Sequence, residues 1–462
     1  MTDQSSSLPF DRSILRASDI RGIVGKNLDE GVVHRIGRAF GTYVRGQGGK
    51  TVAVSFDGRL SSPALEQALV GGLMKSGMTV RRVGRGPSPM LYFATHHLGT
   101  DAGMMITGSH NPPEYNGIKM MLNGQSFHGD DIQRLGTLIE AENFEEVAGA
   151  QENAPVAQAY VNRLMEDFSP ATPLTVAWDA GNGAAGEIMQ ELAARLPGTH
   201  YLLNEEIDGR FPNHHPDPTI EENLEQLKAH VITRKCDLGI AFDGDGDRIG
   251  VVDQKGRVVW GDQMMILFAR EILREHPGAT IIGDVKCSQT FFDEVAKLGG
   301  KPIMWKSGHA MVKAKMVETG ALLAGEMSAH IFFKHRYYGF DDALYAAVRL
   351  LSILGRGEKP LADILDAMPT TVNTPELRFD CDENRKFEVV REVAERLATE
   401  PEAEISTLDG VRVSTKHGWW LLRASNTQAV LVARCESTSH EGLEYLKDTL
   451  RRQLRLSGLD LP

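Results

Sequence analysis

The sequence predicts an α/β protein in which three similar mixed-sheet α/β domains precede a C-terminal α+β domain with an antiparallel sheet. Short apolar segments alternate with helix-like segments through most of the chain, which is typical of doubly wound sheets. From residue 370 the strands are grouped between two helices, which favours an antiparallel sheet. At 462 residues, the chain is also too long for one hydrophobic core.

These changes of pattern divide the chain into four predicted domains. Their lengths are typical of domains, and the first three resemble internal repeats. The predicted ranges are 1–153, 154–256, 257–369 and 370–462.

In the first predicted domain, apolar strands are expected at 51–55, 79–83 and 102–106. Helices at 62–75 and about 89–97 lie between them in the sequence. Each strand is followed by a loop and a helix or by another strand, which is the repeating unit of a doubly wound sheet.

The second and third predicted domains repeat this alternation. Polar loops follow the apolar strands, so functional side chains are expected at strand ends. The predicted strands are 174–178, 238–242, 279–283, 302–305 and 321–324, and the predicted helices are 221–235 and 262–275.

The fourth predicted domain differs because most of its strands follow one another without helices between them. Such a series favours antiparallel pairing. The predicted strands lie near Leu377 and at 410–413, 419–423 and 429–434, and the predicted helices are 383–398 and 440–456.

One loop carries a candidate nucleophile. Residues 107–119 read Thr-Gly-Ser-His-Asn-Pro-Pro-Glu-Tyr-Asn-Gly-Ile-Lys, directly after a predicted strand. This loop places Ser109 at the strand end, with His110 beside it and Lys119 within reach. We expect an exposed Ser109 hydroxyl that acts as a nucleophile or a phosphoryl carrier. An Asn-Pro turn whose serine only caps the backbone is the alternative.

A second loop carries a candidate metal site. The motif Asp243-Gly-Asp-Gly-Asp247-Arg248 follows an apolar strand. If Asp243, Asp245 and Asp247 converge at about 6 Å, each pair repels by about 3 kcal/mol at an effective dielectric of about 20. A bound Mg²⁺ ion would offset this repulsion. The EF-hand pattern fails, because Arg248 and Gln254 stand where Gly and Glu are required. A solvated acidic turn remains the alternative.

Composition limits the possible partners. The formal net charge of −12 argues against non-specific binding to nucleic acid or to anionic membranes. No apolar run approaches the roughly 20 residues that span a bilayer, and no signal peptide is apparent. The cysteines lack metal or redox spacing, so we expect reduced thiols in a cytoplasmic protein. We expect a monomer that acts on small molecules.

With these motifs, the chain resembles the α-D-phosphohexomutase family, in its bacterial phosphomannomutase/phosphoglucomutase branch. The resemblance covers nearly the full length, and the motifs occur in the family's order. They are Ala17-Ser-Asp-Ile-Arg-Gly22, Thr107-Gly-Ser-His-Asn-Pro-Pro113, Phe211-Pro-Asn-His-His-Pro-Asp-Pro218, Asp243-Gly-Asp-Gly-Asp-Arg248, Gly325-Glu-Met-Ser-Ala-His330 and Arg423-Ala-Ser-Asn-Thr427.

The resemblance implies a heart-shaped isomerase with one active site in a central cleft. It implies a phosphorylated Ser109 that passes its phosphoryl group to a hexose monophosphate. The product is glucose 1,6-bisphosphate or mannose 1,6-bisphosphate, which serves as intermediate and activator. The intermediate returns its other phosphoryl group to Ser109, so the 1- and 6-phosphates interconvert. Mg²⁺, held by the three aspartates and a phosphoserine oxygen, would stabilise the transferring group.

The resemblance also implies a role for each candidate residue. The four domains would carry, in order, the phosphoserine loop, the metal loop, the sugar-recognition loop and a phosphate-binding loop. Lys119, Arg21 and His330 remain alternatives for the general base. The implied catalytic residues are Ser109, His110, Lys119, Arg21, Arg248 and His330, and the implied substrate-binding residues are Lys286, His309, Glu326, Ser328, Arg423, Ser425, Asn426 and Thr427.

Three functions remain open. The first is a mutase that acts on both mannose and glucose phosphates. The second is a phosphoglucosamine mutase, which usually has Gln at the position of Met327 and a Ser-Ala-Ser-His-Asn-Pro loop. The third is a non-catalytic sugar-phosphate-binding regulator, against which the intact Ser109, Lys119 and three aspartates argue. A Ser/His hydrolase is disfavoured because the serine lacks the G-x-S-x-G elbow.

Overall fold

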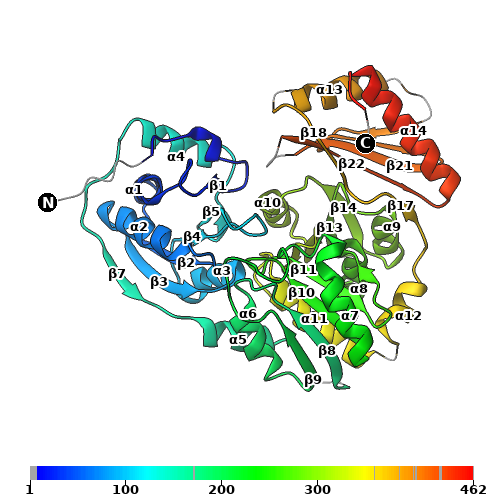
Figure 1. Ribbon diagram of the computed structural model, residues 1–462, viewed down its shortest axis with the longest axis horizontal. Coiled ribbons are helices and arrows are strands. Elements are labelled where there is room, and N and C mark those ends of the chain that lie inside the picture. The colour runs from blue at the N-terminus through cyan, green and yellow to red at the C-terminus, as the bar shows by residue number, and fades with distance from the viewer. Residues whose placement is uncertain are drawn as a thin grey trace.

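The computed structural model describes residues 8–169, 172–357, 359–383, 385–398, 400, 403–425 and 429–460. Four sheets follow one another along the described chain, from the first sheet at the left of Figure 1 to the fourth at the upper right. Three sheets are mixed and covered by helices, and the fourth is entirely antiparallel, which confirms the predicted fold class. The domain boundaries and the cleft remain predictions.

The first sheet has the strand order β1-β5-β4-β2-β3-β7, with β6 paired to β5. The helix predicted at 62–75 begins and ends at the predicted residues. The strands of this sheet and the helices near it are β1 (Ile20–Ile23), α1 (Glu30–Gly46), β2 (Thr51–Phe56), α2 (Ser62–Lys75), β3 (Thr79–Arg85), α3 (Ser88–His97), β4 (Ala102–Ile106), β5 (Tyr115–Leu122), β6 (Gln125–Ser126), α4 (Asp130–Glu140) and β7 (Ala150–Asn153).

The second sheet has the order β12-β11-β10-β8-β9. The helix predicted at 221–235 begins as a 3-10 turn, η2 (Glu221–Leu224), before α7 (Glu225–Arg234). The other elements are α5 (Ala157–Met165), β8 (Leu174–Asp179), α6 (Gly186–Ala193), β9 (Gly198–Leu203), β10 (Leu238–Phe242), β11 (Ile249–Asp253) and β12 (Val258–Val259).

The third sheet has the order β14-β13-β15-β16. The strand predicted at 321–324 begins two residues later than expected, at Leu323. The elements are α8 (Gly261–Glu275), β13 (Thr280–Asp284), α9 (Gln289–Lys297), β14 (Lys301–Trp305), α10 (His309–Thr319), β15 (Leu323–Gly325), β16 (Ile331–Phe333), α11 (Ala343–Arg356) and α12 (Leu361–Asp366).

The first three sheets share one structural unit. In each, a buried strand (β4, β10 or β15) pairs in parallel with one neighbour and antiparallel with the strand that follows it in the chain. A short loop at the carboxyl end of the buried strand makes this connection. The three loops are 107–114, 243–248 and 326–330, which include the serine motif, the aspartate motif and the sugar motif.

The fourth sheet alternates its side chains between two layers, as expected for period-2 strands. Trp420 and Leu422 of β21 pack toward the helices α13 and α14. Trp419 and Leu421 contact Val285 of the third sheet's domain instead. The elements are β17 (Val372–Asn373), β18 (Leu377–Asp380), α13 (Arg385–Leu397), β19 (Glu404–Ser406), β20 (Val411–Thr415), β21 (Gly418–Ala424), β22 (Val430–Ser437) and α14 (His440–Leu456).

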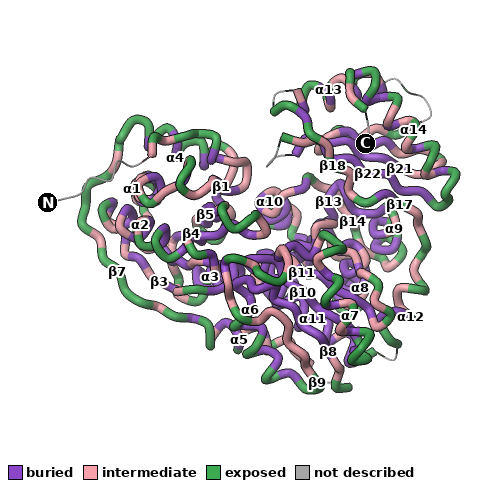
Figure 2. The backbone as a smooth tube through the Cα atoms, viewed as in Figure 1, coloured by how far each residue is buried: buried purple, intermediate pink, exposed green. Residues whose placement is uncertain are grey.

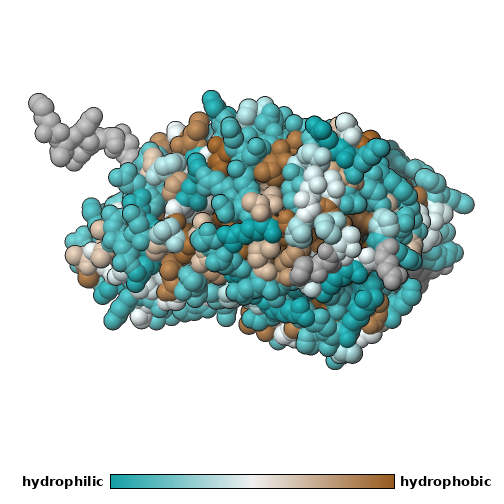
Figure 3. Space-filling view, turned by 90° about the horizontal axis from the view of Figure 1, so that it is seen from below, coloured by the Kyte–Doolittle hydropathy of each residue, from teal (hydrophilic) through white to brown (hydrophobic). Residues whose placement is uncertain are grey.

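The largest hydrophobic core crosses domain limits. It joins α3, α8 and α11 to strands of the second and third sheets, and Figure 2 shows the buried chain concentrated around β10, β11 and α11. The face seen from below is mainly hydrophilic, with small separate hydrophobic patches (Figure 3). Among the described helices, none combines the length and the apolar composition needed to cross a membrane. All four cysteines are buried and free.

Asp342 caps α11 from inside this core. Its carboxylate accepts hydrogen bonds from the Tyr160 hydroxyl at 2.8 Å, the Tyr337 hydroxyl at 2.7 Å and the Tyr345 amide at 2.9 Å. Burial nevertheless raises the pKa of Asp342 from 3.8 to about 6. Folding therefore favours the protonated carboxyl of Asp342 between pH 3.8 and about pH 6. The stability that this protonation contributes at low pH is lost as the pH rises through 6.

We expect the substitution Asp342→Asn to remove this pH dependence, because the amide cannot titrate. Relative to the variant, wild-type protein should lose about 3 kcal/mol of stability between pH 4 and pH 7. Thermal unfolding of both proteins across this range measures the effect. A melting-temperature difference that stays constant with pH would contradict it.

Candidate active site

The three strand-end loops meet one another. The Ser109 hydroxyl donates to Asp243 Oδ2 at 3.1 Å, which joins the serine loop to the aspartate loop. Arg248 and His330 form an antiparallel bridge, which joins the aspartate loop to the sugar loop. Residues that lie more than 130 positions apart, such as Ser109 and Asp243, are therefore direct neighbours.

Ser109 is buried, which corrects the expectation of an exposed hydroxyl. The residue is only 3 % exposed, because the aspartate loop covers it. A Cβ atom on Gly244 would lie 2.3 Å from the Ser109 carbonyl oxygen, so only glycine allows this approach. The Ser109 hydroxyl also lies 3.2 Å from Nδ1 of His110. The hydroxyl is thus beside the acidic group, where the serine loop and the aspartate loop meet.

The three aspartates form a group that can hold a metal ion. Asp243, Asp245 and Asp247 are fully buried, and each offers one oxygen within 4.8 Å of the others. Oδ1 of Asp245 and Oδ1 of Asp247 have no hydrogen-bond partner in the described part of the chain. Burial and the two neighbouring carboxylates raise the pKa of Asp243 well above its ordinary value. Buried anionic oxygens without partners fit a hard divalent cation.

Lys119 supplies the nearest positive charge. Its Nζ lies 2.6 Å from Asp245 Oδ2 and also contacts Asp247. Burial alone would lower the pKa of Lys119, but the two carboxylates raise it well above its ordinary value. Ser88 and Thr107 donate to the same Asp245 oxygen. Lys119 is therefore protonated in this arrangement and offsets part of the acidic charge.

Arg21 contacts the backbone of the serine loop. Its guanidinium donates to the Gly108 carbonyl at 3.1 Å and also contacts Asn111 and Asp19. Arg21 therefore contacts the residue that precedes Ser109, while its catalytic role remains a prediction.

His330 is held between an arginine and a carboxylate. Arg248 Nε donates to His330 Nε2 at 2.9 Å, and His330 Nδ1 lies 3.0 Å from Asp341 Oδ2. Because arginine only donates, Nε2 is the accepting nitrogen and Nδ1 carries the proton toward Asp341. The His309 ring stacks on His330 at 5.9 Å, and burial lowers the pKa of His309 well below its ordinary value.

Two groups of predicted substrate residues lie in the third sheet's domain: Glu326 with Ser328 in the sugar loop, and Lys286 near the fourth sheet. Glu326 is buried, accepts from Ser328 Oγ at 3.3 Å through Oε2, and has no partner for Oε1 among the described residues. Burial raises the pKa of Glu326. Lys286 Nζ lies 3.2 Å from Glu376, so a segment that leads into the fourth sheet is close to this loop.

Arg423 begins the predicted phosphate-binding loop. Its guanidinium lies 3.1 Å from Asp409 Oδ2, and the same oxygen accepts from the Ser307 amide at 3.0 Å. Asp409 therefore links the fourth sheet to the third. Ser425 is buried at the end of β21, while Asn426 and Thr427 lie outside the described residues.

Several residues of the site were not predicted. Ser88, Thr107 and Asp341 contact the aspartates or His330 directly. Thr107 stands within the quoted serine motif, and the pair Asp341-Asp342 directly precedes a helix, so both had a sequence signal. Ser88 had none, because its contact depends on how α3 packs against the aspartate loop.

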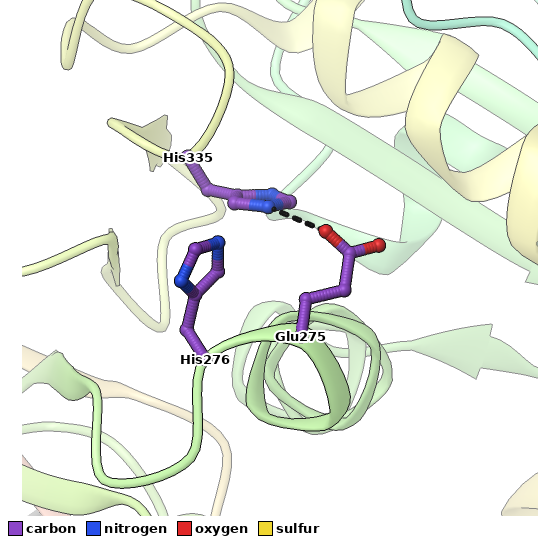
Figure 4. A group of neighbouring side chains, drawn as sticks. All are labelled: Glu275, His276 and His335. Atoms are coloured by element: carbon purple, nitrogen blue, oxygen red, sulfur yellow. Dashed lines mark hydrogen bonds and ion pairs between the residues drawn. The ribbon is translucent and has the colours of Figure 1, made fainter.

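A second cluster, Glu275, His276 and His335, also has metal-ligand spacing. Figure 4 shows His335 hydrogen-bonded to Glu275, with His276 beside them. Arg349 donates to His335 Nδ1 at 3.2 Å, so Nε2 carries the proton and faces Glu275 at 3.0 Å without a lone pair for a metal. Arg336 also pairs with Glu275 at 2.8 Å. This cluster fits an ion-pair network and does not fit a metal site.

Comparison with known proteins gives matches along most of the chain. Four domains described as "Phosphoglucomutase/phosphomannomutase" match it: alpha/beta/alpha domains I, II and III and the C-terminal domain. They cover residues 12–146, 158–256, 260–372 and 376–453.

Individual relatives agree with these matches. The chain is 44% identical over 461 residues to a phosphomannomutase/phosphoglucomutase of Pseudomonas aeruginosa, covering 100% of this chain and 99% of that protein. It is 41% identical over 443 residues to a phosphoglucomutase of Neisseria gonorrhoeae, covering 95% and 96%. The crystal structure of a phosphoglucomutase/phosphomannomutase family protein from Burkholderia thailandensis superposes with a TM-score of 0.93 at 44% identity, covering 98% and 99%.

Proposed function

Because this chain belongs to the phosphoglucomutase/phosphomannomutase family and is a phosphohexomutase, we propose that it interconverts the 1- and 6-phosphates of both mannose and glucose. The reaction would proceed through a phosphorylated Ser109 and a hexose 1,6-bisphosphate. The observation that carries this proposal is the Ser109 hydroxyl, 3.1 Å from one of three buried aspartates. A hydroxyl at a cation-binding group suits a phosphoryl carrier, because a bound cation offsets the charge of the transferring group.

Phosphoryl transfer would take place in two half-reactions. The bond between phosphorus and the Ser109 oxygen breaks, and a bond forms between phosphorus and the free hydroxyl oxygen of the hexose monophosphate. The proton of that hydroxyl passes to a base. In the second half, the other phosphate returns to Ser109 from the bisphosphate, and the proton moves back to the released sugar oxygen.

The aspartates fit Mg²⁺: Asp243, Asp245 and Asp247 would hold it, and a phosphoserine oxygen would complete the ligand set. When bound, Mg²⁺ would stabilise the negative charge of the transferring phosphoryl group. Lys119, paired with Asp245, and Arg21, bonded to the Gly108 carbonyl, add positive charge near Ser109. Nδ1 of His110 lies 3.2 Å from the Ser109 hydroxyl, within hydrogen-bonding distance.

His330 is the best candidate for the general base. Lys119 is held protonated by two carboxylates, and a guanidinium such as that of Arg21 does not deprotonate in proteins. Neutral His330 has one accepting nitrogen, which Arg248 occupies in this structure. Arg248 must therefore turn away, toward a substrate phosphate, before His330 can accept a proton.

Substrate recognition would use the remaining residues. Glu326 Oε1 has no partner among the described residues and can accept a sugar hydroxyl, with Ser328 beside it. Lys286 and Arg423 would bind the non-reacting phosphate through their ammonium and guanidinium groups. His309, whose pKa is lowered by burial, would add a neutral ring N–H as a donor. Ser425, Asn426 and Thr427 would complete this phosphate site. We expect the enzyme to act as a monomer in the cytoplasm.

The test measures turnover with Mg²⁺ and a trace of glucose 1,6-bisphosphate. We expect conversion of mannose 1-phosphate and glucose 1-phosphate to their 6-phosphates, and an intact mass that shows one phosphoryl group on purified enzyme. Turnover of glucosamine 6-phosphate alone would support a phosphoglucosamine mutase instead. Binding of sugar phosphates without turnover or a phosphorylated peptide would support a regulator.

A further inference from the structure

A buried guanidinium lies inside the serine loop. Arg59, which connects β2 to α2, is only 1 % exposed. One of its terminal nitrogens donates to the carbonyls of Pro112 at 2.6 Å and Tyr115 at 3.0 Å. The other donates to the carbonyls of Ser109 at 2.7 Å and Asn111 at 2.5 Å. Four carbonyls of residues 109–115 therefore converge on a single side chain.

The surroundings of Arg59 compensate for its burial. Burial lowers the pKa of Arg59, and Asp57 opposes this shift from 3.2 Å. Asp57 also accepts from the Gly108 amide at 3.1 Å, so the pair binds both donors and acceptors of the serine loop. The Phe211 ring, from the second sheet's domain, lies 5.2 Å from the guanidinium. A buried charge persists only when it is paired and hydrogen-bonded in this way.

Gly108 is required by this contact. A Cβ atom at position 108 would lie 2.4 Å from Nε and 2.5 Å from Cζ of Arg59. The backbone of Gly108 does not need a left-handed conformation, because its φ is not positive. The glycine that precedes the reactive serine therefore serves the close approach of the guanidinium.

Ser109 is the residue that this arrangement constrains. Its φ is 49°, a left-handed conformation that residues other than glycine rarely adopt and that the surrounding structure must hold. The bond from Arg59 fixes the Ser109 carbonyl, and Thr107 Oγ1 accepts from the Ser109 amide at 2.8 Å. With both ends of the residue fixed, the hydroxyl points at Asp243.

We propose that Arg59 is a positioning residue that holds Ser109 in its left-handed conformation and so aims the phosphoryl-carrying oxygen at the aspartates. This inference rests on the proposed function, because it takes Ser109 as the phosphoryl carrier. Arg59 contacts the loop backbone and acts on the reaction only through Ser109.

The test substitutes Arg59→Lys, which keeps the charge but loses the planar fork that binds four carbonyls. We expect kcat to fall about 100-fold, as for a small misplacement of a reacting group. The KM for mannose 1-phosphate should change less than about threefold, because the sugar and phosphate contacts are unaltered. Phosphorylation of the variant by glucose 1,6-bisphosphate, followed by intact mass, should be slowed to the same extent.

A matched control separates positioning from general stability. Arg349 is equally buried at 1 % exposure and pairs with Glu271 in the third sheet's domain. Arg349→Lys should lower the melting temperature and leave kcat within about threefold of wild type. If Arg59→Lys folds and keeps the wild-type kcat, or loses no more than Arg349→Lys does, the inference is overturned.

A second variant approaches the same contact from the loop. Gly108→Ala should displace the guanidinium and also lower kcat by about 10- to 100-fold, with KM little changed. The double variant should lose less than the product of the two single losses, because both remove one contact. Wild-type kcat in Gly108→Ala, or multiplicative losses, would overturn the inference even if Arg59→Lys failed to fold. A wild-type enzyme without mutase activity would instead refute the proposed function, and the inference with it.

Discussion

Replacing Ser109 by alanine is expected to lower kcat for mannose 1-phosphate by on the order of 10⁴-fold or more, as for removal of other covalent nucleophiles. The alanine side chain has no oxygen to carry the phosphoryl group, and the nearby Ser88 and Thr107 hydroxyls donate to Asp245 rather than to Asp243. A coupled assay of product formation measures the loss. Intact mass should show that the variant never gains the phosphoryl group found on wild type.

Ser55→Ala is the matched control for Ser109→Ala. Ser55 is also a buried serine of the first sheet, and its hydroxyl donates to the Gly84 carbonyl at 2.7 Å. This variant loses a structural hydrogen bond of about 1 kcal/mol and should keep nearly the full rate. If Ser109→Ala retained a rate similar to that of Ser55→Ala, Ser109 would not be the phosphoryl carrier.

Local patterns predicted the regular elements well. The helix at 62–75 was found at the predicted residues, because its start and its periodicity depend on neighbours in the sequence. The strand-end positions of the serine and aspartate loops followed in the same way, since an apolar strand that leads into a Gly-rich loop is a local signal. Most of the fold could therefore be predicted before any contact was known.

Contacts between residues far apart in the sequence could not be predicted in this way. The sequence suggested an exposed Ser109, but the second domain's Gly244 covers it. The position of Arg59 among the carbonyls of residues 109–115 likewise depends on the distance between two loops that are joined through a sheet. At Glu275, His276 and His335, the residue types alone do not reveal that Arg349 and Arg336 make the cluster an ion-pair network.

Removal of divalent cations is expected to abolish activity, and added Mg²⁺ should restore it. Of the three fully buried aspartates, Asp245 and Asp247 share Lys119 as their lysine partner, and Oδ1 of each has no hydrogen-bond partner among the described residues, so buried carboxylate oxygens remain for a cation to bind. Asp243→Asn should lower kcat by about 10²- to 10³-fold, comparable to losing one electrostatic contact with a transition state. Steady-state rates after treatment with EDTA, with and without added Mg²⁺, measure the dependence.

Binding of Mg²⁺ should also be visible without turnover. Saturating Mg²⁺ at about 100 times its Kd should stabilise wild type by about 2.7 kcal/mol, and this should raise the melting temperature. The neighbouring carboxylates and burial raise the pKa of Asp243, so protons compete with the metal and the stabilisation should grow as the pH rises. Asp342→Asn, a buried aspartate outside the metal group, should respond to Mg²⁺ as wild type does. Asp243→Asn should respond much less, and an equal response would place the cation elsewhere.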